Sequence, residues 1–246
     1  MNVRTHIRLN RVSSTNEFAQ YLVSRTRPAE GTVISAIDQY AGRGQALRSW
    51  HASPGKNISA SFIYYPDFIP AKDQFRLNMF FSVSALRFFS RFLRDERILI
   101  KWPNDLLIGA SKAAGMLIRV SSAGTHLRQA ILGIGFNIFE DRFPAEIPDP
   151  VSLCRYSDQI PDIPELIDAF QEHLWADYEK FKAGRDPDLE GEYALNLFGM
   201  GEQLHFSSPE TGPFEGVIRG VDEFGRLLIR TMEGRRAFHS GSLVFK

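Results

Sequence analysis

The chain has 246 residues, of which 43% are hydrophobic and 24% are charged, and its 29 basic side chains balance 29 acidic ones. This composition indicates a globular protein with one substantial domain, or one domain plus a small appendage. The formal net charge of zero argues against a large nucleic-acid-binding surface, because such a surface requires a basic surplus.

The sequence carries no signal for export or membrane insertion. Its N-terminus lacks the apolar segment of a signal peptide, and no apolar run approaches the length of a membrane span. The single cysteine, Cys154, excludes an intramolecular disulfide and fits a reducing compartment. The six histidines show no metal-ligand spacing, so we expect no zinc site. These features predict a cytoplasmic protein without a membrane span.

The first sixty-five residues are predicted to contain three strands and one helix. The pattern S-x-x-E from Ser14 to Glu17 is a capping box, which predicts a helix that runs to about Arg25. Apolar runs and alternation predict strands over Thr5–Leu9, Thr32–Tyr40 and Ser59–Tyr65.

A polar segment without periodicity, Ala41–Asn57, joins the second of these strands to the third. It contains three glycines and one proline, and it carries Arg43, Arg48, Trp50 and Lys56. Loops of this length in compact domains are usually functional or disordered. One interpretation is an unstructured loop exposed to solvent. The other is a lid that orders over an anionic ligand and excludes water.

The clearest helix is Gln74–Arg94, whose many phenylalanines predict a broad face packed against a sheet. Farther along, Leu127–Phe139 is predicted to form a buried strand, and the proline-rich segment Glu140–Pro164 is predicted to form a loop. Two more helices are expected over about Pro164–Lys182 and Asp186–Leu197.

Between the long helix and the buried strand lies the stretch around which the chain is organised. Its short apolar runs predict strands at Ile98–Ile100, Leu106–Ile108 and Met116–Val120. Lys101, Asp105 and Lys112 interrupt these runs. They could simply lie on a solvated face. However, two cations and a carboxylate among glycines favour a site for a phosphate-bearing ligand with its metal.

The composition changes at Gly199, after which no helical period remains. Short strands are expected at four places, punctuated by the turn sequences P-E-T-G, D-E-F-G and E-G-R: Gln203–Phe206, Phe214–Val221, Arg226–Thr231 and Arg236–Phe238. The pattern predicts a small antiparallel barrel. We therefore expect two domains, residues 1–198 and 199–246.

Six short motifs, in this order and spacing, resemble those of biotin–protein ligases, also called biotin–[acetyl-CoA-carboxylase] ligases. They are S-S-T-N (13–16), D-Q-Y-A-G-R-G-Q (38–45), W-x-x-S-P-G-K-N (50–57), K-W-P-N-D (101–105), K-A-A-G-M-L-I (112–118) and G-I-G-F-N (133–137). The resemblance is dense over residues 7–155. It implies an α+β fold, with a mixed β-sheet catalytic domain and packed helices followed by a small SH3-like β-barrel. Regulatory members carry a DNA-binding domain before S-S-T-N, and here that motif starts at residue 13, so we expect this domain to be absent.

The resemblance implies a two-step, ATP-dependent reaction. The biotin carboxylate attacks the α-phosphate of ATP and gives biotinyl-5′-AMP and pyrophosphate. A lysine amine of a biotin carboxyl carrier protein, the partner of a biotin-dependent carboxylase, then attacks the adenylate. The first step joins two anions and therefore requires cationic side chains and Mg²⁺.

The resemblance also assigns roles to residues on the biotin side of the site. The catalytic group would be Lys112, Arg43 and Lys101, with Lys112 holding the biotin carboxylate and the reacting phosphate. The biotin ureido group would meet donors and acceptors on Ser14, Thr15, Asn16 and Gln39. The remaining biotin contacts would come from Gly42, Arg43, Gly44, Gln45, Gly115 and Gly133.

On the nucleotide side, the resemblance implies a second group of residues. Asp105 would serve Mg²⁺, and Trp50 could pack over the adenylate when the loop closes. The nucleotide contacts would come from Arg48, Trp50, Asn104, Asp105, Gly135 and Asn137.

One position departs from the common family pattern. The family loop is often G-R-G-R-R-G, whereas this chain has G-R-G-Q-A-L, so Gln45 stands where an arginine beside the adenylate phosphate is common. Arg48 could supply the missing charge, or the adenylate could be held less tightly. The sequence leaves both readings open.

Two alternatives compete with this assignment. A lipoate–protein ligase also forms an acyl-adenylate, but its substrate lacks a ureido ring. A non-catalytic biotin sensor would not require Lys101, Asp105 and Lys112 together. The sequence names no particular carrier protein, and a homodimer could form through an exposed sheet edge.

Overall fold

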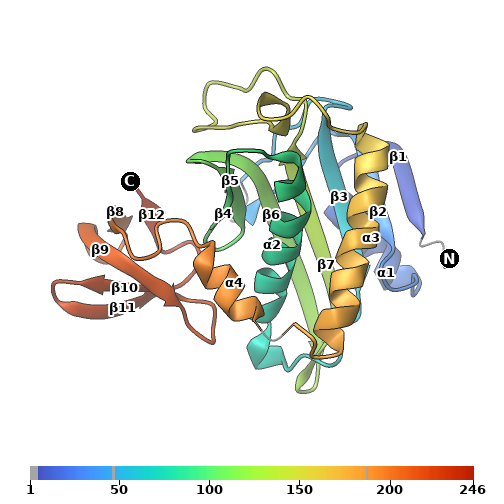
Figure 1. Cartoon of the computed structure of the whole chain (residues 1–246). Helices are drawn as coiled ribbons and strands as arrows, with labels where there is room; N and C mark the ends of the chain where they lie inside the picture. Colours follow the sequence, from blue (N-terminus) through green and yellow to red (C-terminus); the bar gives the residue numbers. More distant parts are fainter. Residues whose placement is uncertain (1–4, 46–47, 187) are drawn as a thin grey trace.

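A seven-stranded mixed sheet forms the larger part of the molecule (Figure 1). The computed structural model describes residues 5–45, 48–186 and 188–246. The strand order is β1-β2-β3-β7-β6-β5-β4, with β1 parallel to β2 and every other neighbouring pair antiparallel. The strands are β1 (His6–Val12), β2 (Val33–Gln39), β3 (Asn57–Tyr64), β4 (Ile98–Lys101), β5 (Asp105–Ile108), β6 (Ser111–Ala123) and β7 (His126–Asn137).

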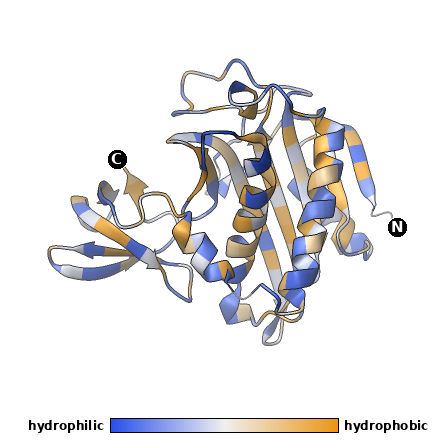
Figure 2. Cartoon of the chain, in the orientation of Figure 1, coloured by the Kyte–Doolittle hydropathy of each residue, from blue (hydrophilic) through white to orange (hydrophobic). Residues whose placement is uncertain are grey.

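Helices cover the two faces of this sheet unequally. Helices α2 (Phe75–Phe89) and α3 (Ile163–Lys182) lie side by side on one face, and α1 (Thr15–Arg25) packs on the other against β2, β3 and β7 (Figure 1). Hydrophobic residues line β7 where it is seen between α2 and α3 (Figure 2). Among the described residues, no helix is long and apolar enough to cross a membrane.

The predicted broad apolar face of the long helix is confirmed. Twelve of the fifteen residues of α2 are buried, and its phenylalanines meet those of the sheet and of α3. The Phe89 ring lies 4.0 Å from Phe136 of β7 and 5.2 Å from Phe170 of α3, measured between centroids. Such aromatic contacts add to the burial of apolar area. The helix ends at Phe89 rather than Arg94, because Ser90–Phe92 tightens into a 3₁₀ turn.

Other predicted boundaries change as well, among them those of β6 and of the last helix. Strand β6 starts at Ser111 rather than Met116, so Lys112 lies within a strand. The helix expected over Asp186–Leu197 is the shorter α4, Leu189–Leu195; Pro187 lies outside the described residues.

The C-terminal segment forms a separate five-stranded antiparallel sheet, in the order β11-β10-β9-β8-β12. The α+β prediction is thus confirmed. The sequence pattern missed the last strand, because two residues give no periodicity. The strands are β8 (Gln203–Ser208), β9 (Gly212–Val221), β10 (Leu227–Thr231), β11 (Gly234–Phe238) and β12 (Val244–Phe245).

Backbone pairing covers the β4 edge with the segment that leads from α4 into the second sheet. The Ile100 amide donates to the Asn196 carbonyl (2.8 Å), and the Phe198 amide donates back to the Ile100 carbonyl (2.9 Å). The indole of Trp102 donates to the carbonyl of Gly225 in the turn after β9 (2.9 Å). This edge strand is therefore covered rather than open, which removes one exposed sheet edge.

Candidate active site

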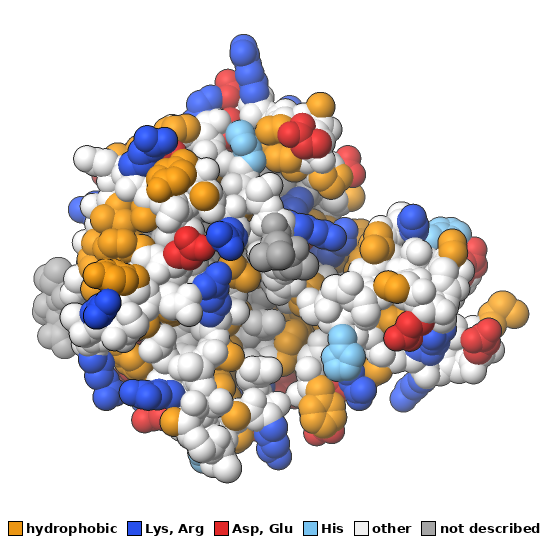
Figure 3. All heavy atoms as spheres, turned by 180° about the vertical axis from the view of Figure 1, so that it is seen from behind, with side chains coloured by type: hydrophobic (Ala, Val, Ile, Leu, Met, Phe, Trp, Pro, Cys, Tyr) orange, Lys and Arg blue, Asp and Glu red, His pale blue; other side chains and the backbone are white. Residues whose placement is uncertain are grey.

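The charged residues of the central stretch meet on the sheet face opposite α2 and α3. Lys112 Nζ lies 2.7 Å from Asp105 Oδ2, and both side chains keep about a third or a quarter of their surface exposed (35% and 25%). Lys101 and Asp105 are direct partners across β4 and β5. Basic side chains gather near the middle of this face (Figure 3). The structure thus pairs Lys112 with Asp105 and sets Lys101 opposite Asp105, on a face where these side chains stay partly exposed.

The Lys101 side chain contacts an aromatic ring of the C-terminal sheet. Its Nζ lies 5.0 Å from the ring centroid of Phe245 in β12. Burial lowers the pKa of Lys101, with Lys112 and Arg48 acting in the same direction and Asp105 opposing. A less hydrated ammonium gains more from a new anion than a fully solvated one does.

The N-terminus of α1 and the end of β2 form the second part of the site. Ser14 is the N-cap, and its hydroxyl accepts from the Glu17 amide (3.5 Å), as the capping-box pattern predicted. The amide and the hydroxyl of Thr15 both donate to Gln39 Oε1 (2.9 and 3.1 Å), and this hydroxyl also contacts Ser61 Oγ (2.9 Å). Gln39 thus fixes the first turn of the helix against the sheet.

Asn16 carries an unsatisfied acceptor in the same region. Its Nδ2 donates to the Leu117 carbonyl (2.9 Å), while Oδ1 is buried and has no hydrogen-bond partner among the described residues. A Cβ on Gly133 would lie 2.3 Å from Asn16 Nδ2, so only glycine allows this approach. A buried polar atom without a partner is costly, and a ligand donor would relieve that cost.

Trp50 lies on the glycines of the central strands. A Cβ on Gly135 would come within 2.3 Å of the indole, and one on Gly115 would come within 3.0 Å. The Trp50 Nε1 is buried and lacks a partner among the described residues, and Lys112 Nζ lies 5.7 Å from the ring. Both glycines therefore make room for a planar group directly beside Lys112.

The polar segment Ala41–Asn57 folds back on itself, although Ala46 and Leu47 lie outside the described residues. Arg43 and Ser49 form a β-bridge, the Gly44 amide donates to the Arg48 carbonyl (2.7 Å), and the Trp50 amide donates to the Gly42 carbonyl (2.9 Å). These bonds carry Trp50 back over the sheet.

Two side chains of this segment have partners that the sequence did not indicate. Arg43 Nε lies 3.2 Å from Glu17 Oε1, so Glu17 is paired with the loop. Gln45 Oε1 accepts from Ser240 Oγ, in the turn between β11 and β12 (3.0 Å). The position that departs from the common family pattern therefore links the loop to the second sheet.

The two asparagines expected at the nucleotide donate to backbone carbonyl groups in this structure. Asn104 Nδ2 donates to the Met116 carbonyl. Asn137 Nδ2 donates to the Val151 carbonyl (3.2 Å). Both side chains fix the strands and loop around Lys112, whose own amide donates to the Asp149 carbonyl (2.7 Å). Their contacts with a nucleotide stay a prediction.

Sequence reasoning missed Glu140, which holds the end of the loop to the sheet. Its side chain is only 1% exposed, and Oε2 accepts from the Ser53 amide and from Asn57 Nδ2, each at 2.9 Å. Burial alone would raise the pKa of Glu140, but these hydrogen bonds outweigh burial and hold the pKa below its ordinary value. A lone glutamate at the start of a proline-rich loop gives no sequence signal.

We expect Glu140→Gln to destabilise the protein by about 1–3 kcal/mol at neutral pH, because charged acceptors form stronger hydrogen bonds. Since the folded-state pKa is depressed, this contribution is present above the unfolded value near 4.5 and is lost as the pH falls through the lower folded value. Urea unfolding at pH 7 and at pH 3.5 measures the difference. The exposed Glu146→Gln should change stability by less than about 0.5 kcal/mol; equal effects of both substitutions would contradict the assignment.

Comparisons with known proteins agree with this geometry. Residues 9–137 match the model of the biotin/lipoate A/B protein ligase family, and residues 200–246 match the biotin protein ligase C-terminal domain. The chain therefore belongs to the biotin/lipoate A/B protein ligase family. Within that family, the relatives it resembles are biotin protein ligases.

Three of these relatives are informative. The bifunctional ligase/repressor BirA of Bacillus spizizenii is 32% identical, over 94% of this chain and 71% of its own length. The biotin–[acetyl-CoA-carboxylase] ligase of Paracoccus denitrificans is 25% identical, over 96% of this chain and 99% of its own length. The structure of the Aquifex aeolicus biotin protein ligase with biotin and ATP superposes with a TM-score of 0.80 at 24% identity, covering 99% of both chains.

Proposed function

We propose that this protein is an ATP-dependent biotin–protein ligase, which activates biotin as biotinyl-5′-AMP and transfers it to a lysine of a biotin carboxyl carrier protein. The pairing of Lys112 with Asp105, beside Gly115 and the Trp50 indole, carries the proposal. It sets a cation where a carboxylate and a phosphate must approach each other, next to a surface that accepts a planar group.

Biotin would bind between the N-terminus of α1 and the glycines of β6 and β7. Its ureido N–H groups are donors, and the unsatisfied Asn16 Oδ1 is an acceptor of the right kind. Gln39, Thr15 and Ser14 would border the same group, because they surround the first turn of α1. The carboxylate would point toward Lys112.

ATP would lie along the glycines now in contact with Trp50, with its phosphates near Lys101 and Lys112. The indole occupies that surface in the described structure, so we propose that it moves to pack over the adenine or the adenylate. Arg43 and Arg48 would reach the phosphates from the loop.

Mg²⁺ would arrive with ATP as part of the substrate. The described residues contain no group of three or more His, Cys, Asp or Glu side chains that could hold a metal ion, and Asp105 is the carboxylate nearest Lys112. One carboxylate plus substrate phosphates is a normal set of Mg²⁺ ligands. Asp105 would therefore complete the shell of a nucleotide-bound ion.

Biotin-dependent exchange between ATP and labelled pyrophosphate tests the proposal. Exchange with biotin and little or none with lipoate is the expected result, because lipoate has no ureido group to meet Asn16. Exchange with lipoate alone would make this a lipoate ligase. Tight biotin binding without exchange would favour the non-catalytic sensor.

Several further properties remain part of the proposal. Residues 1–198 would form the catalytic domain, and residues 199–246 an SH3-like domain. The protein would work in the cytoplasm without binding nucleic acid, as its net charge of zero suggests. Strand β1 has β2 as its sole strand partner among the described residues, so it is the edge through which a homodimer would form.

The loop Gly42–Asn57 is expected to close over the ligands. Arg43 and Arg48 are exposed, so trypsin should cut at one or both in the free protein, and biotin plus ATP should protect them. Cleavage at Arg185, in the connection between α3 and α4, should continue in both states. Equal cleavage at the loop with and without ligands would count against a lid.

A further inference from the structure

Ser61 of β3 is a buried serine beside the proposed biotin pocket. It is 0% exposed, and it pairs across the strands with Gly133, the glycine that Asn16 approaches. Its hydroxyl lies 2.9 Å from the Thr15 hydroxyl, so the contact joins β3 to the first turn of α1. This is the one hydrogen bond of the Ser61 hydroxyl with a described residue. A buried hydroxyl needs such a partner, and here the partner belongs to the candidate active site.

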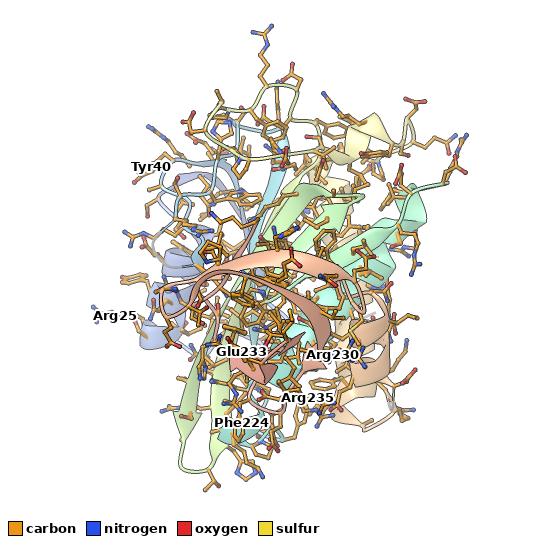
Figure 4. All side chains as sticks on the ribbon, turned by 90° about the vertical axis from the view of Figure 1, so that its left-hand side faces the viewer. Arg25, Tyr40, Phe224, Arg230, Glu233 and Arg235 are labelled. Atoms are coloured by element: carbon orange, nitrogen blue, oxygen red, sulfur yellow. The ribbon has the colours of Figure 1, made fainter. Side chains whose placement is uncertain are left out.

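The side-chain amide of Gln39 has a fixed orientation. The Thr15 backbone N–H can only donate, so the atom that faces it at 2.9 Å must be the oxygen Oε1. Gln39 Nε2 lies against Gly42, where an added Cβ would come within 2.7 Å of it. Figure 4 shows Arg25, the last residue of α1, far below Tyr40, the residue after Gln39. Gln39 therefore lies at the N-terminal end of the helix, and its Nε2 is a donor without a hydrogen-bond partner among the described residues.

The two hydroxyl groups then have one order of donation. Gln39 Oε1 can only accept, so the Thr15 hydroxyl gives its single proton to that oxygen at 3.1 Å. The contact between Thr15 and Ser61 must therefore use the Ser61 proton, with Thr15 Oγ1 as the acceptor. The hydrogen bonds run from Ser61 to Thr15 and from Thr15 to Gln39. Each bond in such a chain strengthens the next.

We propose that Ser61 is a positioning residue for biotin recognition: it orients the Thr15 hydroxyl toward Gln39 Oε1 and so keeps Gln39 Nε2 turned to the ligand. This role rests on the proposed function, because the biotin ureido carbonyl is the acceptor that Gln39 Nε2 would meet. Ser61 acts through Thr15 and does not itself contact biotin. Its effect should therefore appear in biotin binding and not in ATP binding.

Isothermal titration of the full chain with biotin tests this role. Ser61→Ala removes the first donor and should weaken biotin binding about 3- to 10-fold, the value of one neutral hydrogen bond, while the KM for ATP in pyrophosphate exchange stays unchanged. Ser82→Ala is the matched control. Ser82 lies on α2, is 1% exposed, and its hydroxyl has no hydrogen-bond partner among the described residues. Its replacement should leave biotin affinity unchanged.

A double-mutant cycle separates positioning from a structural role. Thr15→Val keeps the shape of the side chain but removes the hydroxyl through which Ser61 acts. In that background, Ser61→Ala should change biotin affinity by less than about twofold. An equal loss in both backgrounds would show that Ser61 does not act through Thr15 and would overturn the proposal. Ser61→Cys has a similar size and only a weak donor, so it should also lose affinity and repeats the test if the alanine variant unfolds.

The native chain and the ligand-free protein supply the remaining controls. A native chain that does not bind biotin would contradict the proposed function. Native binding together with unchanged affinity in Ser61→Ala would contradict only the positioning role. In the ligand-free ¹⁵N-labelled protein, Ser61→Ala should shift the side-chain amide resonances of Gln39, and Ser82→Ala should not. Absence of that shift would refute the hydrogen-bond chain whatever the ligand.

Discussion

Lys112→Gln should lower the rate of biotin-dependent ATP–pyrophosphate exchange by about 10²–10³, the usual cost of removing one donor that stabilises developing charge. The glutamine keeps much of the side-chain length but removes the cation, and it leaves Asp105 without the partner now 2.7 Å away. We expect the variant to keep its fold, since both side chains are partly exposed. Thermal unfolding of the variant checks this directly.

Two controls sharpen the Lys112 experiment. Lys182 is the last residue of α3, on the other face of the sheet, and its side chain pairs with Glu30. Lys182→Gln should therefore leave the exchange rate unchanged. The double variant Lys112→Gln with Asp105→Asn removes the uncompensated carboxylate, so it should recover stability but not rate. Exchange at the native rate in Lys112→Gln would end the assignment of this lysine.

Gln45→Arg should slow the escape of biotinyl-5′-AMP from the enzyme by roughly 10- to 150-fold, the value of one charge-assisted contact of about 1.5–3 kcal/mol. The arginine would add a cation to the loop where the common family pattern has one. Rapid filtration after single-turnover adenylation measures this release. The native chain should accordingly release the adenylate faster than relatives that carry the arginine.

Two further variants separate charge from domain contact. Gln45→Met has a similar size and removes the hydrogen bond to Ser240 without adding a charge, so it isolates the contribution of that link. Arg48→Ala tests compensation, because Arg48 is close enough to Lys101 to depress that lysine's pKa. If Gln45→Arg leaves release unchanged while Arg48→Ala speeds it, Arg48 already supplies the missing charge.

The pattern of short apolar runs was sufficient to predict most strands and the two long helices. It also predicted that Lys101, Asp105 and Lys112 belong to one ligand site, because charged side chains are rare in half-buried strands unless they have a partner. Boundaries were wrong where tertiary contacts extend or shorten an element. At its start, strand β6 gains Ser111–Gly115, because β5 pairs with Ser111, Lys112 and Gly115 and β7 pairs with Ala114 and Gly115.

What the sequence could not predict are contacts between distant segments. Glu140 is far in sequence from Ser53 and Asn57, and Ser240 is 195 residues from Gln45. Neither pair has a local pattern, since a hydrogen bond between two loops imposes no periodicity. Trp50 was expected at the nucleotide only after closure, yet it already covers Gly115 and Gly135.

The contact between Phe245 and Lys101 has a practical consequence for handling the protein. Strand β12 ends one residue before Lys246, whose amide donates to the His205 carbonyl (3.0 Å), so anything fused after it leaves the molecule beside Lys101. Strand β1 lies on the far side of the large sheet (Figure 1). Affinity tags and surface anchors therefore belong at the N-terminus, where they cannot crowd the lysine or add charges next to it.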